Sequence, residues 1–356
     1  MRISTLATVM VAVVVSAVST SAHRAESGSD EIRLLKADAV ARAQVWMPTD
    51  IPAVDIRTGP YGRRAFGFRE TVTCDYVDKD LAGRSPKFAC ASAGDELKVK
   101  FGSGNAEVYA EVAATRLLWA LGFGADRMFP VRVICRGCPE NLTGILRADG
   151  STLFDPAAIE RTMPGKEFKP DSSWAWAELD NVQEARGGAP AAHRDALKLL
   201  AVFLQHTDSK PEQQRIECLE DDTRTASTCT RPLMMINDVG LTFGGVSLVN
   251  ANSKGMNLAA WAATPIWKGE SGCVGNLAKS ATGTLKDPVI SDSGRAFLAG
   301  LLTQLSDDQI STLFEVSRVT LRLRDPEDVR SGFATVAEWV SVFKRKRAEI
   351  VDRRCG

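Results

Sequence analysis

The sequence contains few of the residues and motifs on which several common enzyme classes depend. Histidine occurs only three times in 356 residues, and neither His193 nor His206 belongs to an H-E-x-x-H segment or another metal-binding pattern. No G-x-S-x-G segment provides the nucleophile of a serine hydrolase, and no Walker A sequence provides a P-loop. Zinc hydrolases, serine hydrolases of this type and P-loop proteins are therefore disfavoured.

An excess of charge of one sign is also missing. Lys and Arg total 44, and so do Asp and Glu. No overall field attracts the chain to nucleic acid or to an anionic membrane, and no RNA- or DNA-binding signature occurs, so we expect no nucleic-acid partner. Hydrophobic residues make up 44% of the chain, which is enough for one large domain of two lobes or for two small domains.

One long apolar run is present, and it stands at the N-terminus. Arg2 precedes a nearly continuous apolar stretch from Ile3 to Val18, and small residues follow at 20–22. This pattern predicts a signal peptide over residues 1–22 and an exported protein, periplasmic or secreted. An uncleaved anchor is less favoured, because the run is shorter than about 20 residues and no charged stop follows. No later segment is apolar enough to cross a bilayer.

The eight cysteines form an even set, which in an exported chain indicates up to four disulfides. The sequence does not choose among the possible pairings. Proximity along the chain favours the following pairs: Cys74 with Cys90, Cys135 with Cys138, Cys218 with Cys229, and Cys273 with Cys355. The C-R-G-C segment at 135–138 leaves a redox site or half of a zinc site as less favoured alternatives.

Hydrophobic periodicity divides the chain into segments. Residues 23–50 form a leader. Residues 51–138 contain short β-type runs and one helical stripe that starts at Asn105 and ends at Gly122, which predicts a small β-rich N-lobe. Residues 139–190 are rich in Gly, Pro and Asp and are interpreted as an inter-lobe connection. Residues 191–356 predict a mainly helical C-lobe. We therefore expect an α+β protein with a small antiparallel β lobe containing one helix and a larger helical lobe.

A polar segment, His206 to Gln213, follows a strong amphipathic helix. Its sequence H-T-D-S-K-P-E-Q resembles the H-x-D-x-K-P-E part of the protein-kinase catalytic loop, with Asp208 at the position of the base. Gln213 stands where that loop has Asn. A Gln oxygen can still bind Mg²⁺, although its side chain is one carbon longer. The alternative is an ordinary solvated loop, and His206 is expected to orient the loop rather than act as a base.

A second motif, Asp238-Val239-Gly240, follows the apolar strand predicted at 233–236. It resembles the D-F-G motif of kinases with Val in place of Phe. Asp-x-Gly is a common turn, so its position after the loop of Asp208 is what gives it weight.

A third pair consists of Lys100 at the end of a predicted strand and Glu111 near the start of the helix that follows. Lys98 lies on the same strand face as Lys100, and Glu107 lies on the same helix face as Glu111, so the pattern alone does not choose the partners. We select Lys100 with Glu111. Two glycine-containing segments, 59–67 and 102–105, could approach phosphates, but both could equally be plain turns.

Together these motifs, between Lys98 and Gly244, resemble atypical kinases of the phosphoinositide-kinase-like and secretory-pathway type. The resemblance implies a two-lobed protein-kinase-like fold, ATP with Mg²⁺ or Mn²⁺, and transfer of the γ-phosphoryl group to a hydroxyl of a protein, glycan or small molecule. It assigns catalysis to Asp208 and Lys210, nucleotide anchoring to Lys100 and Glu111, and metal binding to Gln213 and Asp238.

Two other interpretations stay open. An exported pseudokinase, or a module that binds a ligand or a protein without catalysis, would keep the fold. Gln213 and the scarcity of ATP outside cells favour this interpretation. An unrelated fold with accidental motif matches is the other.

Overall fold

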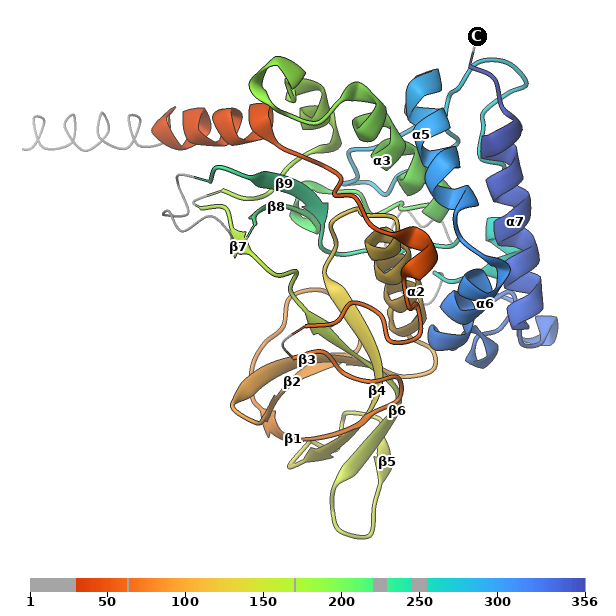
Figure 1. The fold of residues 1–356 in the computed structure, drawn as a ribbon. Coiled ribbons are helices and arrows are strands. Elements are labelled where there is room, and N and C mark those ends of the chain that lie inside the picture. The colour runs from red at the N-terminus through yellow and green to blue at the C-terminus, as the bar shows by residue number, and fades with distance from the viewer. Residues whose placement is uncertain (1–29, 63, 170, 220–228, 245–254, 356) are drawn as a thin grey trace, which may run out of the picture.

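The computed structural model describes residues 30–62, 64–169, 171–219, 229–244 and 255–355 of an α+β protein (Figure 1). The signal peptide predicted at 1–22 lies outside these residues. The strands are β1 (Thr71–Val77), β2 (Lys87–Ser92), β3 (Asp95–Phe101), β4 (Arg127–Arg136), β5 (Ile145–Leu146), β6 (Thr152–Arg161), β7 (Lys166–Glu167), β8 (Gln214–Cys218) and β9 (Pro232–Ile236). The α-helices are α2 (Glu107–Ala120), α3 (Ala191–Leu204), α4 (Leu258–Ala263), α5 (Asp292–Thr303), α6 (Asp307–Val316) and α7 (Val336–Asp352), preceded by a helix over residues 30–42.

The first sheet closes on itself. Its strands follow the order β3-β2-β1-β4-β6, and β6 also pairs with β3, so they form a barrel to which β5 is attached (Figure 1). β1 and β4 are parallel, so the expectation of a purely antiparallel sheet is wrong. Alternate residues of a strand point to one face, and here the inward positions are apolar. The interior contains Val72, Cys74, Phe88, Cys90, Leu97, Val99, Phe101, Phe129, Val131, Val133, Cys135, Phe154, Ala157 and Ile159.

Helix α2 lies between the barrel and the other helices (Figure 1). It packs against β4 and β6 on the barrel side and against α6 on the other side. Every residue of α2 except Trp119 is buried, and its apolar residues belong to the large core shared with α3, α5, α6 and α7. Because a helix that is buried on all sides needs partners on all sides, α2 is fixed by both parts of the molecule.

The remaining helices pack as a group beside α2. α3 contacts α5, and α7 contacts α5, α6 and α4. Ser291, Ser306 and Thr335 cap α5, α6 and α7, since the hydroxyl of each accepts a backbone N–H from the first helical turn. We call these helices, together with the antiparallel strands β7, β8 and β9, the helical part.

The segment expected to be a leader, 23–50, belongs to the core where the structure describes it. Val40, Ala43 and Val45 are buried in the large core. Gln44 forms a parallel bridge with Leu233 of β9. The reason is physical: the extended stretch after the helix pairs with β9 through Gln44 and bridges from Trp46 to Phe123, just after α2.

The boundaries expected for the N-lobe (51–138) and for the inter-lobe connection (139–190) are also wrong. β5 and β6 lie within the supposed connection, and β6 closes the barrel by pairing with both β3 and β4. The barrel therefore extends to Arg161. The chain then enters the helical part through β7, which pairs with β8.

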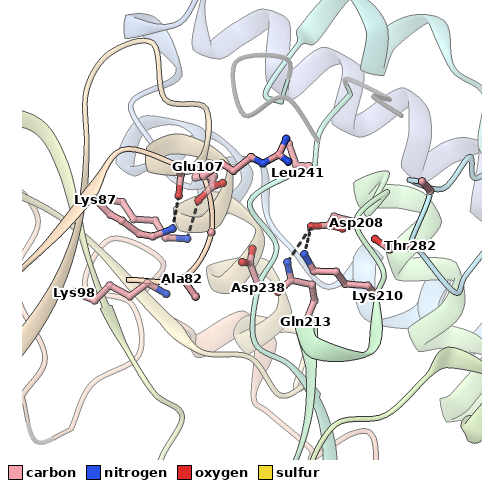
Figure 2. Close-up of a pocket in the computed structure, with 15 residues that line it drawn as sticks. Ala82, Lys87, Lys98, Glu107, Asp208, Lys210, Gln213, Asp238, Leu241 and Thr282 are labelled. Carbon is pink, nitrogen blue, oxygen red and sulfur yellow. Dashed lines mark hydrogen bonds and ion pairs between the residues drawn. The ribbon is translucent and has the colours of Figure 1, made fainter. Parts of the chain in front are cut away.

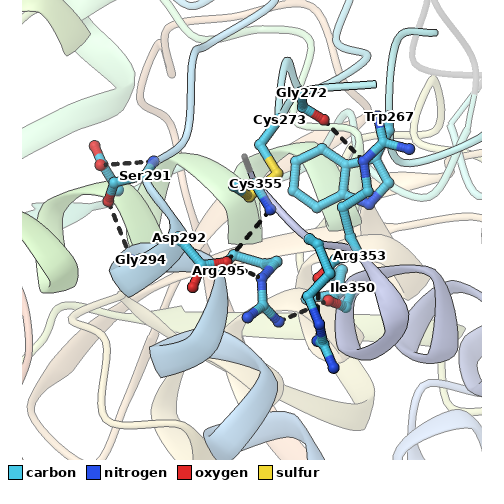
Figure 3. Close-up of a disulfide and its surroundings, with 12 residues drawn as sticks. Trp267, Gly272, Cys273, Ser291, Asp292, Gly294, Arg295, Ile350, Arg353 and Cys355 are labelled. Atoms are coloured by element: carbon cyan, nitrogen blue, oxygen red, sulfur yellow. Dashed lines mark hydrogen bonds and ion pairs between the residues drawn. A yellow bond between two sulfur atoms is a disulfide. The ribbon is translucent and has the colours of Figure 1, made fainter. Parts of the chain in front are cut away.

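The four disulfides are those favoured by proximity along the chain, namely Cys74–Cys90, Cys135–Cys138, Cys218–Cys229 and Cys273–Cys355. They are consistent with an extracellular protein. Cys273–Cys355 fastens the C-terminal end of the chain beside α5 (Figure 3). There the Asp292 carboxylate accepts hydrogen bonds from the Cys355 N–H and from Arg295. Along the described residues, no helix combines the length and the apolar character needed to span a bilayer.

Candidate active site

The loop with Asp208 begins where α3 ends. Gln205 caps α3 in a left-handed conformation with φ of 54°, and its N–H and that of His206 turn back to Ala201. A non-glycine residue in this region is strained, and such strain persists only where neighbouring contacts enforce it. The cap directs the chain out of the helix, so that the following residues reach the cleft between the barrel and the helical part.

Both oxygens of the Asp208 carboxylate are held by neighbouring side chains. The Gln213 Nε2 donates to Oδ2 at 2.9 Å, and the Lys210 Nζ lies 3.6 Å from the same oxygen. The hydroxyl of Ser280 donates to Oδ1 at 3.3 Å. Ser280, which belongs to no sequence motif, is buried, so Asp208 is oriented by groups from two separate segments of the chain.

Asp238 is brought to the same loop by backbone hydrogen bonds. β8 begins directly after Gln213 and pairs with β9, which ends just before Asp238. The carbonyl of Gln213 accepts the N–H of Asn237 at 2.9 Å and that of Asp238 at 3.4 Å. The two motifs are therefore the two ends of one hairpin, which explains why a long insertion between them does not separate them.

Burial alone would raise the pKa of Asp238, but the Lys100 ammonium and the Gly240 N–H, 3.0 Å from Oδ1, outweigh it and hold the pKa well below its ordinary value. The carboxylate therefore stays ionised. Gly240 is required for space, because a Cβ there would lie 2.5 Å from Cγ of Glu107.

Lys100 forms the expected ion pair with Glu111, with Nζ 2.5 Å from Oε1. Its Nζ also lies 2.9 Å from Oε2 of Glu107, so both acidic residues on this helix face contact it. Burial lowers the pKa of Lys100, but the surrounding carboxylates of Glu111, Asp238 and Glu107 raise it well above its ordinary value. Lys98 instead pairs with Glu160, at 2.7 Å.

These groups line one cleft of about 470 Å³. Figure 2 shows Asp208, Lys210, Gln213 and Asp238 on one side, and Lys87, Lys98 and Glu107 on the other. All six predicted site residues lie in or beside it: Lys100 is among the lining residues, and Glu111 reaches the site through Lys100. The lining residues are Ala82, Gly83, Arg84, Ser85, Lys87, Lys98, Lys100, Glu107, Asp208, Lys210, Gln213, Asp238, Leu241, Ala281 and Thr282.

The β1–β2 connection, Ala82 to Ser85, covers the cleft from the barrel side. Neither glycine segment considered from the sequence lines this cleft; Ser103 and Gly104 line a different cavity. Burial and the nearby Lys100 ammonium lower the pKa of Lys87. Repulsion between neighbouring ammonium groups has this effect, and an anion bound between them would reduce it. Gly83 is the only glycine among residues 82–85, and a single glycine is too weak a sequence signal to predict that this connection covers a cleft.

His206 lies behind the loop rather than in the cleft. Burial lowers its pKa to about 4, against the opposite effect of Asp238 and Asp208, so the imidazole is neutral at pH 7. Its ring centroid lies 6.2 Å from that of Trp176. This packing agrees with an orienting residue and not with a general base.

The donor set suits a hard divalent cation. Asp238 provides an ionised carboxylate, and since the Gln213 Nε2 faces Asp208, its Oε1 is the amide atom left for another contact. Oxygen donors are the ligands that Mg²⁺ and Mn²⁺ prefer. No group of three or more His, Cys, Asp or Glu in the described ranges could hold a metal ion. Water and phosphate oxygens would have to complete the shell, as is usual for Mg²⁺.

No family model matches the chain, and neither does any curated protein. Among solved structures, the chain is similar to the proinflammatory kinase CtkA of Helicobacter pylori, with a TM-score of 0.42 and 10% sequence identity, covering 78% of this chain and 94% of that chain. A superposition at this level does not by itself establish a shared fold or a shared activity.

Proposed function

We propose that this chain is an exported atypical kinase that transfers the γ-phosphoryl group of ATP to a hydroxyl group of an acceptor. One observation supports this proposal above the others: Asp208, Lys210, Gln213 and Asp238 of the helical part face the buried Lys100 across a single cleft. The barrel and the helical part would correspond to the two lobes of a kinase. The four disulfides and the predicted signal peptide support export.

The barrel side would bind the nucleotide phosphates. Lys100, oriented by Glu107 and Glu111, presents its ammonium at the back of the cleft. Lys87 and Lys98 add positive charge at the same wall. Fixed cations of this kind stabilise the charge that develops on a transferring phosphoryl group, because they need no reorganisation during the reaction.

The helical side would position the acceptor. Asp208 accepts the proton of the acceptor hydroxyl, and the contacts of Gln213 and Ser280 fix the direction of its carboxylate. Lys210 neutralises charge next to it. Asp238 and Gln213 would hold Mg²⁺ or Mn²⁺, which, when bound, neutralises phosphate charge and orients the phosphates for in-line transfer.

A pseudokinase or ligand-binding module is the second candidate. The hydrogen bond between Gln213 and Asp208 favours it, since an amide committed to the base has less freedom to bind a metal ion. This candidate would bind nucleotide or another anion in the same cleft without transferring phosphate.

The experiment measures nucleotide binding and transfer separately. Thermal unfolding with ATP and Mg²⁺ or Mn²⁺ reports binding, and labelled ATP reports transfer. We expect a nucleotide-dependent rise in Tm that Asp238→Ala removes. We expect transfer to fall at least a hundredfold in Asp208→Ala, since positioned acid–base groups contribute roughly 10²–10⁴ in rate.

Asp308→Asn provides the matched control, because Asp308 is an exposed carboxylate at the start of α6, outside the cleft. It should behave as the unmodified protein in both assays. Binding without transfer by the unmodified protein would support the second candidate. The absence of both binding and transfer would exclude the kinase.

A further inference from the structure

A tight turn over residues 280–283 lies against the loop of Asp208. The Gly283 N–H donates to the Ser280 carbonyl at 3.1 Å, which makes Ala281 and Thr282 the central residues of a β-turn. The Ser280 N–H donates to the Thr207 carbonyl at 2.9 Å. The turn is thus attached to the residue directly before Asp208.

The chain after the turn is attached to the residue that follows Asp208. The Thr284 N–H and hydroxyl both donate to the Ser209 carbonyl, at 3.0 and 2.8 Å, and the Leu285 N–H donates to the Ser209 hydroxyl at 3.0 Å. Gly283 leaves no spare room, since a Cβ there would lie 3.0 Å from the Ser209 Oγ. The turn is therefore held in a fixed position relative to Asp208.

The three hydroxyl side chains of this segment differ in what they contact. Ser280 is buried and donates to Asp208, and Thr284 donates to Ser209. Thr282 is exposed and lines the cleft with Asp208 and Lys210, and Figure 2 shows it on the side of these two residues. Within the described part of the chain, its hydroxyl makes no hydrogen bond, so it is the one hydroxyl of the turn that is free to react.

We propose that Thr282 is an internal phosphoacceptor: the cleft phosphorylates its own turn. This inference rests on the proposed function and identifies one hydroxyl that it acts on. The Thr282 Oγ1 forms a bond to the γ-phosphorus of ATP, the bond from that phosphorus to the β–γ bridging oxygen breaks, and ADP leaves. The proton of the hydroxyl passes to the carboxylate of Asp208.

The location of the product explains why the reaction would stop at one phosphate. A phosphothreonine adds close to two negative charges at pH 7. At Thr282 these charges would lie in the cleft that Lys210 and Arg84 also line, where the phosphates of a second nucleotide would meet them. We therefore expect one phosphate per chain.

The test uses the full exported chain with its disulfides intact, incubated with ATP and Mg²⁺ or Mn²⁺. Phosphorylated residues are located by tandem mass spectrometry. We expect phosphate on Thr282, at an initial rate per chain that does not change with protein concentration, because acceptor and base belong to the same molecule. Thr282→Val should lower self-phosphorylation at least tenfold, and Thr320→Val, an exposed threonine outside the cleft, should change it less than twofold.

Nucleotide-induced stabilisation, measured on the same samples, separates the two proposals. A rise in Tm with ATP but no phosphate on Thr282, or undiminished labelling of Thr282→Val, would overturn the internal acceptor alone. A rate proportional to protein concentration would overturn transfer within one chain. If ATP causes neither stabilisation nor transfer, the proposed function itself is wrong.

Discussion

Lys100 balances more than one negative charge. Its ammonium lies within 2.9 Å of carboxylate oxygens of both Glu107 and Glu111, and Asp238 acts on it electrostatically. Burial and the neighbouring carboxylates of Asp238 and Glu107 outweigh Lys100 and raise the pKa of Glu111 well above its ordinary value, so acidic groups are crowded at the back of the cleft. A divalent cation that arrives with phosphates would offset this crowding of acidic groups on the side of Asp238.

Replacement of Lys100 by Met should be costly for folding as well as for activity. Breaking a buried ion pair leaves uncompensated charge and typically costs about 3–5 kcal/mol. We expect a loss of this size in the free energy of unfolding, measured by urea denaturation.

Lys98→Met is the matched control, because Lys98 lies on the same strand face and its side chain is 35% exposed. Its pair with Glu160 should contribute no more than about 1 kcal/mol. Equal losses in the two variants would contradict the charge balance described for Lys100.

At the scale of elements, β8 connects the barrel with the helical part through Arg215. Its Nη2 donates to Asp126, just before β4, at 2.8 Å, and its Nε donates to Glu217 at 2.9 Å. Asp126 also accepts the N–H of Met163, where the chain leaves the barrel, at 2.8 Å. The Arg215 guanidinium therefore donates hydrogen bonds to two buried carboxylates, those of Asp126 and Glu217, at the junction.

This junction should make stability depend on pH. Burial raises the pKa of Asp126 to about 6, and the partial compensation by Arg215 does not cancel it. Burial likewise raises the pKa of Glu217 to about 7. A carboxyl whose pKa is raised by folding stabilises the fold below its unfolded pKa, and this contribution is lost as pH rises through the folded pKa.

Asp126→Asn removes one of these titrations. Since a shift of two pKa units corresponds to roughly 3 kcal/mol, the Tm of Asp126→Asn relative to the unmodified protein should increase between pH 4 and pH 7. Both proteins are measured at each pH, because both contain His206. The lowered pKa of His206 reduces stability as pH falls, and this contribution is the same in the two proteins and cancels. Asp75→Asn, an exposed carboxylate on β1, should show a constant difference. A constant difference for Asp126→Asn as well would exclude the effect.

The elements that carry the predicted site residues could be expected from the sequence because their patterns are local. The apolar spacing of α3 and the uninterrupted apolar run of β9 locate the segments before Asp208 and Asp238. Helical spacing does not choose between Glu107 and Glu111 as the partner of Lys100, because both lie on one helix face and both contact Lys100.

The remaining elements depend on contacts that no local pattern reveals. β6 carries Asp155-Pro156 within a segment of turn-like composition, and it becomes a strand because it closes the barrel between β3 and β4. β8 is polar and short and is stabilised by pairing with β9. Ser280 is far from Asp208 in the sequence, so only the tertiary fold shows that its hydroxyl donates to the Asp208 carboxylate.

At the scale of the whole molecule, each disulfide lies within one part. Cys74–Cys90 joins β1 to β2, and Cys273–Cys355 lies within the helical part. A crosslink stabilises mainly by restricting the unfolded chain, and more so for a longer loop. The sequence separation is 82 residues for Cys273–Cys355 but 3 for Cys135–Cys138.

Removal of Cys273–Cys355 by a double Ser substitution should therefore lower the free energy of unfolding by about 4 kcal/mol. Removal of Cys135–Cys138 by the same substitution should have a much smaller effect, and it serves as the control. Chemical denaturation under oxidising conditions measures both. A larger loss for the short loop would show that local packing, rather than chain entropy, determines the contribution of these bonds.

The burial of α2 has a consequence for regulation. Many signalling enzymes are switched by moving a helix that carries a catalytic glutamate, but here such a movement would expose nearly the whole surface of α2 to water. The pair formed by Lys100 and Glu111 should therefore persist in every state of the folded protein. The proposed kinase would therefore lack an inactive conformation of this kind, and its output would be limited by the supply of nucleotide and acceptor.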